Sequence, residues 1–171
     1  MNQTRAESRP GEVRIDQPPA RDAQLRFIGR IRTPWTTREQ CPKSSREAIE
    51  RGDGAISTIE IDDLYVEGLK DLSNFSHVWA LYWMGEAARD LVVQVPKLLG
   101  EPRGVFALRS PARPNPIAMA AAELIAIEGR TLTVLGVDCL DGTPLIDIKP
   151  YFASTDAIAH ASAARRSVRQ D

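Results

Sequence analysis

Short stretches in which polar and apolar residues alternate dominate the chain between residues 25 and 152, and such alternation predicts β-strands. Residues 25–33 (LRFIGRIRT) alternate strictly, with apolar side chains or glycine on one face and mostly arginine on the other. Residues 77–84 (HVWALYWM) are apolar on both faces, which is typical of a strand covered on both sides. Further short strands are predicted at residues 57–61, 91–95, 105–108, 122–127, 131–137 and 145–148.

Glycine-containing turns separate these strands. Glu128-Gly129-Arg130 predicts a hairpin between two strands, and Asp141-Gly142 predicts a turn before the last one. Helices are expected only at residues 62–72 and, more weakly, at residues 44–51, where Gly52 ends the pattern. Many short strands with frequent Gly and Pro indicate a mainly β protein, a small antiparallel sheet closing into a barrel with one or two short helices.

The length of 171 residues fits one domain, and 43% apolar residues suffice for a hydrophobic core. Residues 1–24 hold three prolines, many charges and few apolar side chains, so we expect a disordered N-terminal arm. Residues 153–171 form an Ala/Arg-rich C-terminal tail, for which a short helix and a loose segment are both open. The folded unit is therefore expected at residues 25–152.

Charge and hydropathy exclude several classes of protein. Lys and Arg number 22 against 23 Asp and Glu, so the net charge of −1 excludes a protein that coats nucleic acid through bulk charge. No apolar run is long enough to span a bilayer, and the polar N-terminal residues do not form a signal peptide. We therefore expect a cytoplasmic protein without a membrane partner.

The two cysteines, Cys41 and Cys139, lie far apart in the sequence and neither belongs to a Cys-x-x-Cys pair. The two histidines, His77 and His160, are not near them in sequence, so no zinc site is predicted. We expect two reduced thiols that pack as small apolar side chains, and no metal.

Residues 109–117 (RSPARPNPI) form the most unusual stretch. Three prolines fix φ, remove backbone donors and push each preceding residue toward extended geometry. The segment is therefore stiff and displays Arg109, Arg113 and Asn115. Either it is a rigid connector between strands, or it is a preorganised clamp for an anionic group such as a carboxylate or phosphate.

Three other groups of residues each allow two interpretations. Residues 136–151 (GVDCLDGTPLIDIKPY) concentrate Asp138, Asp141 and Asp147 around apolar strands, although DGTP alone is most often a plain turn. His77 is either a structural histidine or a base. The arginines of the first strand lie either on a solvated face or against a phosphate backbone. No nucleotide-binding glycine loop, serine-hydrolase elbow or zinc-protease helix is found in the sequence.

Four blocks resemble one known family: residues 27–35 (FIGRIRTPW), 74–84 (NFSHVWALYWM), 104–117 (GVFALRSPARPNPI) and 140–151 (LDGTPLIDIKPY). They are similar, in the same order, to the TrmO/TsaA-like (VirR-like) family, in its short form. The resemblance implies a homodimeric β-barrel methyltransferase that uses S-adenosyl-L-methionine. Its implied substrate is N6-threonylcarbamoyladenosine at position 37, in the anticodon loop of tRNA, methylated on N6.

The resemblance also implies site residues. Cofactor contacts of the family fall on Arg109, Met119, Leu135, Gly136, Val137 and Asp138. Two further family regions align with Ser45, Arg46 and Glu47 and with Gly85 and Glu86. Candidates for the base that accepts the N6 proton are Asp138, Asp141 and His77. Phosphate contacts to the RNA are expected from Arg26, Arg30, Arg32, Arg113 and Lys149.

Two other functions remain open from the sequence. One is a methyltransferase of the same fold that acts on another small molecule or RNA. The other is a non-catalytic regulatory module that binds S-adenosylmethionine or RNA and keeps the barrel without the chemistry.

Overall fold

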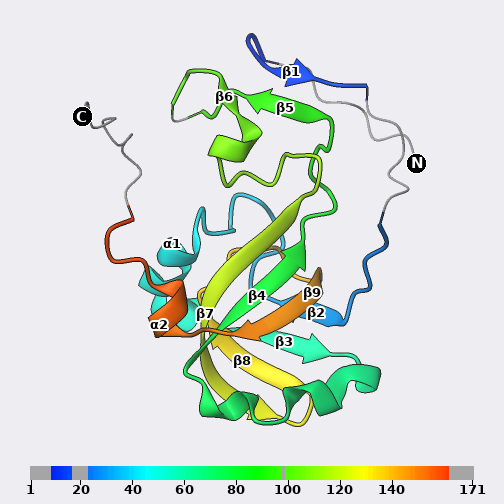
Figure 1. Cartoon of the computed structure of the whole chain (residues 1–171), viewed down its shortest axis with the longest axis vertical. Coiled ribbons are helices and arrows are strands. Elements are labelled where there is room, and N and C mark those ends of the chain that lie inside the picture. Colours follow the sequence, from blue (N-terminus) through cyan, green and yellow to red (C-terminus); the bar gives the residue numbers. More distant parts are fainter. Residues whose placement is uncertain (1–8, 17–22, 98, 162–171) are drawn as a thin grey trace, which may run out of the picture.

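Six antiparallel strands form a closed barrel at the centre of the computed structural model, which describes residues 9–16, 23–97 and 99–161 (Figure 1). The strand order around the barrel is β2-β3-β8-β7-β4-β9. Their bounds are β2 Gly29–Arg32, β3 Ser57–Ile61, β4 His77–Trp83, β7 Ile117–Glu128, β8 Thr131–Leu135 and β9 Thr143–Pro150. The prediction of a mainly β protein that closes into a small antiparallel barrel is confirmed.

The barrel interior is filled by the apolar residues that alternate along these strands. Every second residue of β3, from Ser57 to Ile61, is buried, and β4 and β8 show the same alternation. Burial of each large aliphatic side chain contributes about 1.5–3 kcal/mol, so this single cluster supplies most of the stabilisation. Its fully buried members include Ile31, Ile59, Val78, Ala80, Tyr82, Ala120, Ala122, Leu132, Val134 and Leu145.

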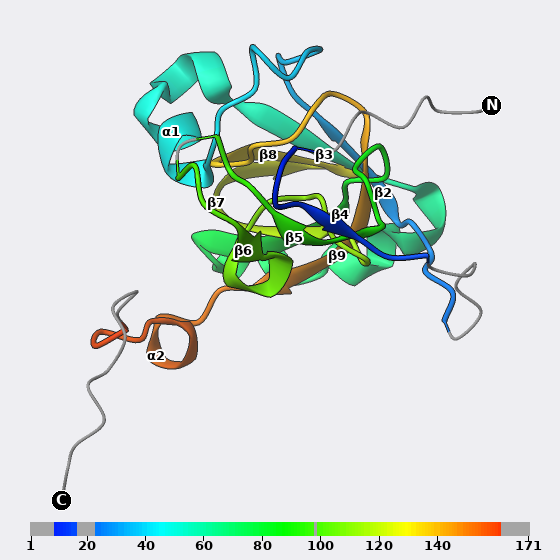
Figure 2. The same ribbon diagram turned by 90° about the horizontal axis from the view of Figure 1, so that it is seen from above.

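A second sheet of three short strands, in the order β1-β5-β6, lies across one end of the barrel (Figures 1 and 2). It consists of β1 Val13–Arg14, β5 Leu91–Gln94 and β6 Arg103–Gly104. β5 matches its predicted strand. β1 falls inside the segment expected to be a disordered arm. Pairing of its backbone with β5 and the 2.6 Å contact between Arg14 and Asp90 order residues that have few apolar side chains of their own.

The rest of that expected arm divides into two parts. Residues 1–8 and 17–22 lie outside the described residues, and residues 23–24 have no regular structure. In the C-terminal tail the structure contains a short helix, α2 Ala153–Asp156, and residues 162–171 lie outside the described part.

The predicted helices form where expected, but one differs in type. α1 spans Ser45–Glu50, and the side chain of Ser44 caps it by accepting a hydrogen bond from the Glu47 amide. The segment predicted as a helix at residues 62–72 instead forms 3-10 turns, η2 Asp63–Leu69 and η3 Leu72–Asn74. Asp71 lies between them with φ 65°, a left-handed conformation that no continuous helix accommodates.

The strand predicted at residues 105–108 is wrong, because these residues form a 3-10 turn, η4 Val105–Ala107. The carbonyl oxygens of Val105 and Leu108 accept hydrogen bonds from the Arg113 side chain rather than from a neighbouring strand. Long-range partners of this kind override a local preference for extended structure.

Several strands are longer or shorter than the alternation predicts. β7 begins at Ile117, because all seven residues of β4 pair with it from His77↔Glu123 to Trp83↔Ile117. β2 is only four residues long, and of the predicted residues 25–28 only Ile28 bonds to the barrel, through Leu145. The hairpin between β7 and β8 turns at Gly129, with φ 58°, as expected.

The described residues contain no helix with the length and apolar content that crossing a membrane requires. They also contain no cis peptide bond. Cys41 and Cys139 are both free thiols, as predicted.

We predict that Gly29→Ala destabilises the barrel. A Cβ at Gly29 would lie 2.1 Å from the Glu60 carbonyl oxygen on the paired strand, and that backbone cannot move without disturbing the ladder. The free energy of unfolding in urea should fall by about 3 kcal/mol. Gly68→Ala is the matched control, because no atom lies within 4 Å of its Cβ position. Equal stability of the two variants would contradict this account of the β2–β3 contact.

Candidate cofactor and substrate site

The segment that follows β8, residues 136–142, leaves the barrel wall and turns across its end. Gly136 makes the turn possible with φ 107°, a conformation that other residues rarely adopt. A Cβ there would lie 3.3 Å from Ile49 of α1 and 3.4 Å from the Ala121 carbonyl oxygen. Val137 and Cys139 are fully buried, whereas Asp138 between them is half-buried. Asp138 is therefore the one residue of this short run that both the barrel interior and the surface can reach.

Tyr82 of β4 contacts this carboxylate from inside the barrel. Its side chain is 1% exposed, and its hydroxyl donates a hydrogen bond to Oδ1 of Asp138. Burial, and then the negative charge of Asp138, raise the pKa of Tyr82 far above its ordinary value. The phenol therefore keeps its proton near neutral pH and acts as the hydrogen-bond donor.

The backbone of the same segment is also held in place. The Cys41 thiol donates to the Asp138 carbonyl oxygen at 3.3 Å, and the Thr33 hydroxyl donates to the Cys139 carbonyl oxygen at 3.0 Å. Two further backbone bonds join Asp141 to Trp35, in the chain that follows β2, and Gly142 to Ile31 of β2 itself. The segment is thus attached on both sides of Asp138.

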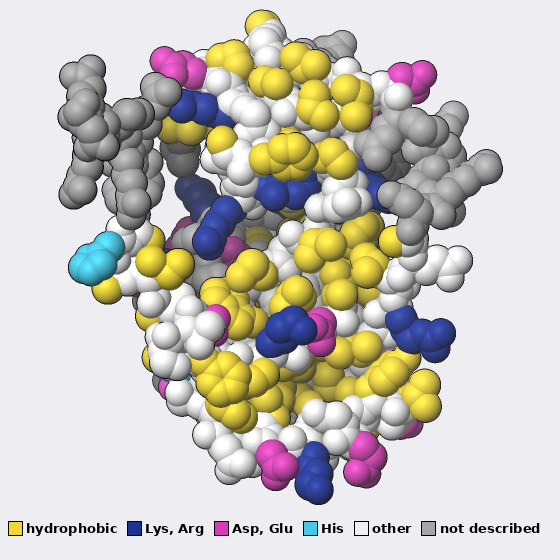
Figure 3. Space-filling model, in the orientation of Figure 1, with side chains coloured by type: hydrophobic (Ala, Val, Ile, Leu, Met, Phe, Trp, Pro, Cys, Tyr) yellow, Lys and Arg dark blue, Asp and Glu magenta, His cyan; other side chains and the backbone are white. Residues whose placement is uncertain are grey.

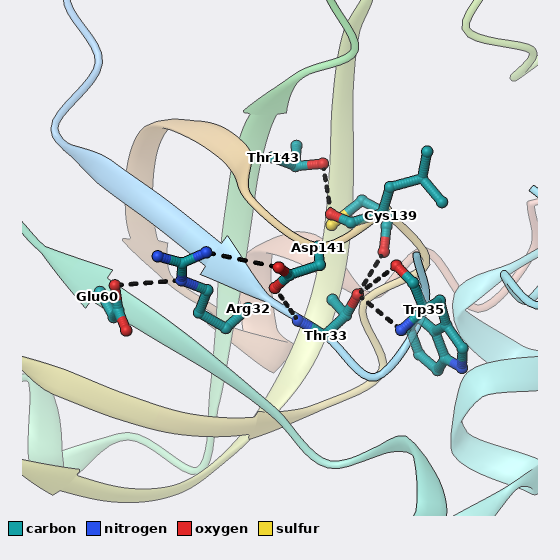
Figure 4. Close-up of polar contacts among 8 residues, drawn as sticks. Arg32, Thr33, Trp35, Glu60, Cys139, Asp141 and Thr143 are labelled. Atoms are coloured by element: carbon teal, nitrogen blue, oxygen red, sulfur yellow. Dashed lines mark hydrogen bonds and ion pairs between the residues drawn. The ribbon is translucent and has the colours of Figure 1, made fainter. Parts of the chain in front are cut away.

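Asp141 fixes the turn before β9 (Figure 4). Its carboxylate accepts from the Thr33 amide at 3.2 Å and lies 3.5 Å from Nη1 of Arg32. Arg32 also contacts Glu60, at 3.3 Å. Asp141 is therefore already engaged as a turn-forming acceptor, and the charge of Arg32 is balanced by two carboxylates.

The proline-rich loop is organised by Arg113. Its guanidinium donates to the carbonyl oxygens of Val105 at 3.1 Å, of Ser110 at 2.8 Å and of Leu108. The expectation that the loop displays Arg113 is therefore wrong, because this side chain is used within the loop. Arg109, by contrast, is exposed, and its side chain has no hydrogen bond or ion pair among the residues that the structure describes. Arg109 is the residue of this loop that remains available for an anion.

Arg89 also holds the loop, although no sequence motif indicates it. Its Nε donates to the Pro114 carbonyl oxygen at 2.8 Å, and its guanidinium lies 5.3 Å from the centre of the Trp83 ring. Asn115, which the sequence analysis expects to be displayed by the proline-rich loop, has its Oδ1 3.5 Å from Nη2 of Arg89. An isolated arginine in a loop gives no signal of such a long-range role.

The proline-rich loop and residues 136–142 lie at the same end of the barrel. Tyr82, which binds Asp138, pairs with Ala118 of β7, and the loop that carries Arg109 ends at Pro116, directly before this strand. No hydrogen bond or ion pair between Arg109 and Asp138 is found within the described ranges. The two side chains are therefore not joined to each other in the described part of the chain.

Met119 lies on the other side of the barrel wall from Tyr82. It is 51% exposed and pairs with Leu81, whose side chain also points outward. Figure 3 shows that hydrophobic side chains gather on the face formed by β4, β7 and β9. Met119 thus belongs to an outer apolar surface, whereas Asp138 is reached from the barrel end.

The first additional region that the resemblance implies, Ser45 to Glu47, lies on α1. The Glu47 carboxylate accepts from the Lys43 amide at 2.9 Å and contacts Arg51 at 2.6 Å. These bonds, the amide of Lys43 first, lower the pKa of Glu47. α1 packs toward residues 135–138 through Ile49, so this region lies next to the segment of Asp138.

The second additional region, Gly85 and Glu86, follows β4 and is exposed. A Cβ on Gly85 would lie 2.9 Å from the Trp83 ring, so any larger residue would require this ring to shift. Because β4 ends at Trp83, this region also lies at the barrel end where Tyr82 meets Asp138.

Some of the Arg and Lys side chains expected to contact RNA are already paired within the chain, and others are not. Lys149 is paired with Asp147 at 2.6 Å, and Arg32 and Arg113 are engaged as described. Arg26 and Arg30 are exposed, and their side chains have no ion pair in the described part of the chain. Only these two are unengaged members of the predicted set.

His77 is separated from the other candidate bases. It lies at the start of β4, five residues before Tyr82, which corresponds to roughly 16 Å along a strand. Its Nδ1 contacts the Ser76 hydroxyl at 3.0 Å, and its ring lies 6.2 Å from that of Tyr151. The structure therefore does not bring His77 together with Asp138.

A groove of about 490 Å³ lies elsewhere, between η2, η3 and β9. Its lining is mostly apolar and includes Ile28, Tyr65, Leu69, Phe75 and Ile148. The lining of this groove contains none of the cofactor contacts that the family resemblance implies. Among the described residues no cluster of three or more His, Cys, Asp or Glu side chains is arranged to hold a metal ion.

We predict that both thiols react slowly with alkylating reagents in the folded protein. Burial raises the pKa of Cys41 to about 11 and that of Cys139 to about 12. Because the thiolate is the reactive form, alkylation by iodoacetamide should increase steadily from pH 8 to pH 10.5 without reaching a plateau near pH 9. In urea, where the chain is unfolded, the rate of alkylation should level off just above the ordinary pKa of a free cysteine thiol. A folded-state plateau near pH 9 would contradict this assignment.

Comparison with known proteins places these residues in a family. Residues 30–157 match the model of the "tRNA-methyltransferase O N-terminal domain". The chain is 41% identical over 150 residues to the "Probable S-adenosyl-L-methionine-binding protein VirR" of Rhizobium radiobacter, covering 88% of this chain and 82% of the relative. It is also 46% identical over 92 residues to the mouse "tRNA (adenine(37)-N6)-methyltransferase", covering 52% of this chain and 21% of that enzyme.

Solved structures agree with this match. The crystal structure of TrmO from Pseudomonas aeruginosa superposes with a TM-score of 0.68 at 34% sequence identity. The alignment covers 84% of this chain and 62% of that one. The barrel is therefore of the TrmO type, and the chain spans less than two thirds of the length of that enzyme.

Proposed function

The chain belongs to the family of tRNA-methyltransferase O N-terminal domains, and we propose that it is an S-adenosylmethionine-dependent tRNA methyltransferase. The proposed substrate is N6-threonylcarbamoyladenosine at position 37, methylated on N6. The observation that carries the proposal is the barrel end at which Asp138 is anchored and to which the proline-rich loop with the unpaired Arg109 leads. We propose that it works on tRNA in the cytoplasm.

The described residues suit S-adenosylmethionine. The unengaged guanidinium of Arg109 suits its carboxylate, and the stiff loop keeps the entropic cost of binding low. One oxygen of the half-buried Asp138 carboxylate is free to accept hydrogen bonds from the ribose hydroxyls. The adenine edge is proposed to lie against the half-buried Leu135, at the end of β8 and beside Gly136 and Val137. These three contacts would hold the carboxylate, the ribose and the base of the cofactor.

The cofactor supplies an electrophilic methyl group on a sulfonium. The residues of this chain contribute by holding N6 of the nucleoside near that methyl group, about 3–3.5 Å away and in line, which can provide much of the rate enhancement. The N6 proton must also leave. Asp141 is engaged in its turn, His77 lies far along β4, and the free oxygen of Asp138 is proposed to bind the ribose, so none of the three predicted candidates is assigned as the acceptor.

Contacts to tRNA are proposed for Arg26 and Arg30. Both are exposed and unengaged in the described ranges, so they can bind phosphates without breaking an ion pair. A net charge of −1 makes such contacts few for each chain, and the proposed homodimer would double them. Adenosine 37 would leave the loop stack to reach the barrel end.

The function is tested with the full chain, methyl-labelled S-adenosylmethionine and two tRNA preparations. One carries N6-threonylcarbamoyladenosine, and the other is the same tRNA without that modification. We expect label in a nucleoside of the modified tRNA alone. Transfer to both tRNAs would indicate the same fold with another substrate, and binding of the cofactor without any transfer would indicate a regulatory module. Either result contradicts the proposal.

We predict that Arg109→Ala weakens binding of S-adenosylmethionine at least tenfold, which corresponds to about 1.4 kcal/mol. The reason is loss of the only guanidinium of the proline-rich loop that is not engaged within it. Isothermal titration calorimetry measures the affinity. Arg103→Ala, which removes an exposed arginine that pairs only with Glu101 at 3.4 Å, is the control and should bind normally. Equal affinities of the two variants would remove Arg109 from the site.

A further inference from the structure

Tyr82 carries a polar group that packing does not require. It is the only side chain with a hydroxyl among the large, fully buried residues of the described structure. The buried cluster to which it belongs is mostly aliphatic, and phenylalanine would fill nearly the same volume without the cost of burying a hydroxyl. The hydroxyl is therefore best explained by its partner, the carboxylate of Asp138.

Asp138 is not a buried charge that needs this bond for its own stability. It is half-buried, its Oδ1 accepts from Tyr82, and its second carboxylate oxygen has no partner among the described residues. The bond from a rigid donor in a β-strand restricts the rotation of the aspartate side chain. With its backbone held by Cys41, Asp138 thus presents one free oxygen in a fixed direction.

We propose that Tyr82 is a positioning residue, whose hydroxyl holds the Asp138 carboxylate so that its free oxygen meets the ribose hydroxyls of S-adenosylmethionine. The inference rests on the proposed function. Tyr82 acts through Asp138 and does not touch the ligand itself. Because the carboxylate is oriented before the ligand arrives, binding does not have to restrict it further.

The environment of Tyr82 fits this role and excludes another one. Burial and the charge of Asp138 raise the pKa of Tyr82, so the phenol keeps its proton and cannot serve as the base for N6. The hydrogen bond from a neutral donor to a charged acceptor is also stronger than a neutral pair. A permanent donor is what orientation of a carboxylate requires.

The test uses calorimetry with two probes, S-adenosylhomocysteine and its 2′,3′-dideoxy analogue. Tyr82→Phe should bind S-adenosylhomocysteine about tenfold more weakly than the wild type. The dideoxy analogue should bind the wild type and Tyr82→Phe equally, because it lacks the groups that Asp138 contacts; this equality also shows that the variant is folded. Tyr65→Phe, at the groove by η2, is the matched control and should change neither affinity.

A double-mutant cycle with Asp138→Ala separates positioning from a general effect on the barrel. In the Asp138→Ala background, Tyr82→Phe should cause no further loss of affinity for S-adenosylhomocysteine. In steady-state kinetics, Tyr82→Phe should raise KM for S-adenosylmethionine and leave KM for tRNA unchanged.

Three results overturn the inference while the wild type still binds S-adenosylhomocysteine. They are an unchanged affinity of Tyr82→Phe for this probe, an equal loss for both probes, and additive losses in the double variant. Failure of the wild type itself to bind S-adenosylhomocysteine would instead overturn the proposed function, so the two claims fail in distinguishable ways.

Discussion

The position of β4 between β7 and β9 is the constraint on which the rest of the structure depends. β4 pairs with both strands, over seven residues with β7, and so closes the barrel. This register places Tyr82 inside, opposite Ala118, and places Leu81 and Trp83 on the outer face. A shift of one residue would exchange the two faces and would remove the partner of Asp138 from the interior. The geometry of the candidate site therefore follows from the way the barrel closes.

The two halves of the site are stiffened in different ways. Prolines restrict the backbone of the loop before β7, and Arg113 and Arg89 bind its carbonyl oxygens, so that Arg109 is left free. The segment after β8 has no prolines before Pro144 and is held by hydrogen bonds to Thr33, Cys41 and Tyr82. Both arrangements fix the backbone before a ligand binds, which lowers the entropic cost of binding.

Local patterns predicted those parts of the fold that local interactions decide. The strand pattern at Ser57–Ile61 and the helix pattern at residues 44–51 predicted elements that the structure confirms. The prediction of a strand at 105–108 is wrong, because Arg113 binds the carbonyl oxygens of this segment. A strand, β1, forms where a disordered arm is expected, because it pairs with β5, which is distant in sequence. At the site, motifs indicated Arg109 and Asp138, but the roles of Arg113, Arg89 and Tyr82 depend on side-chain directions that only the closed barrel defines.

A crystal structure of the full chain with S-adenosylhomocysteine tests the central claim most directly. The account predicts the ligand at the barrel end, with its ribose on the free oxygen of Asp138 and its carboxylate on Arg109 of the same or a second copy of the chain. Electron density for the ligand in the groove beside η2 and η3, with Asp138 and Arg109 both uncontacted, would contradict it.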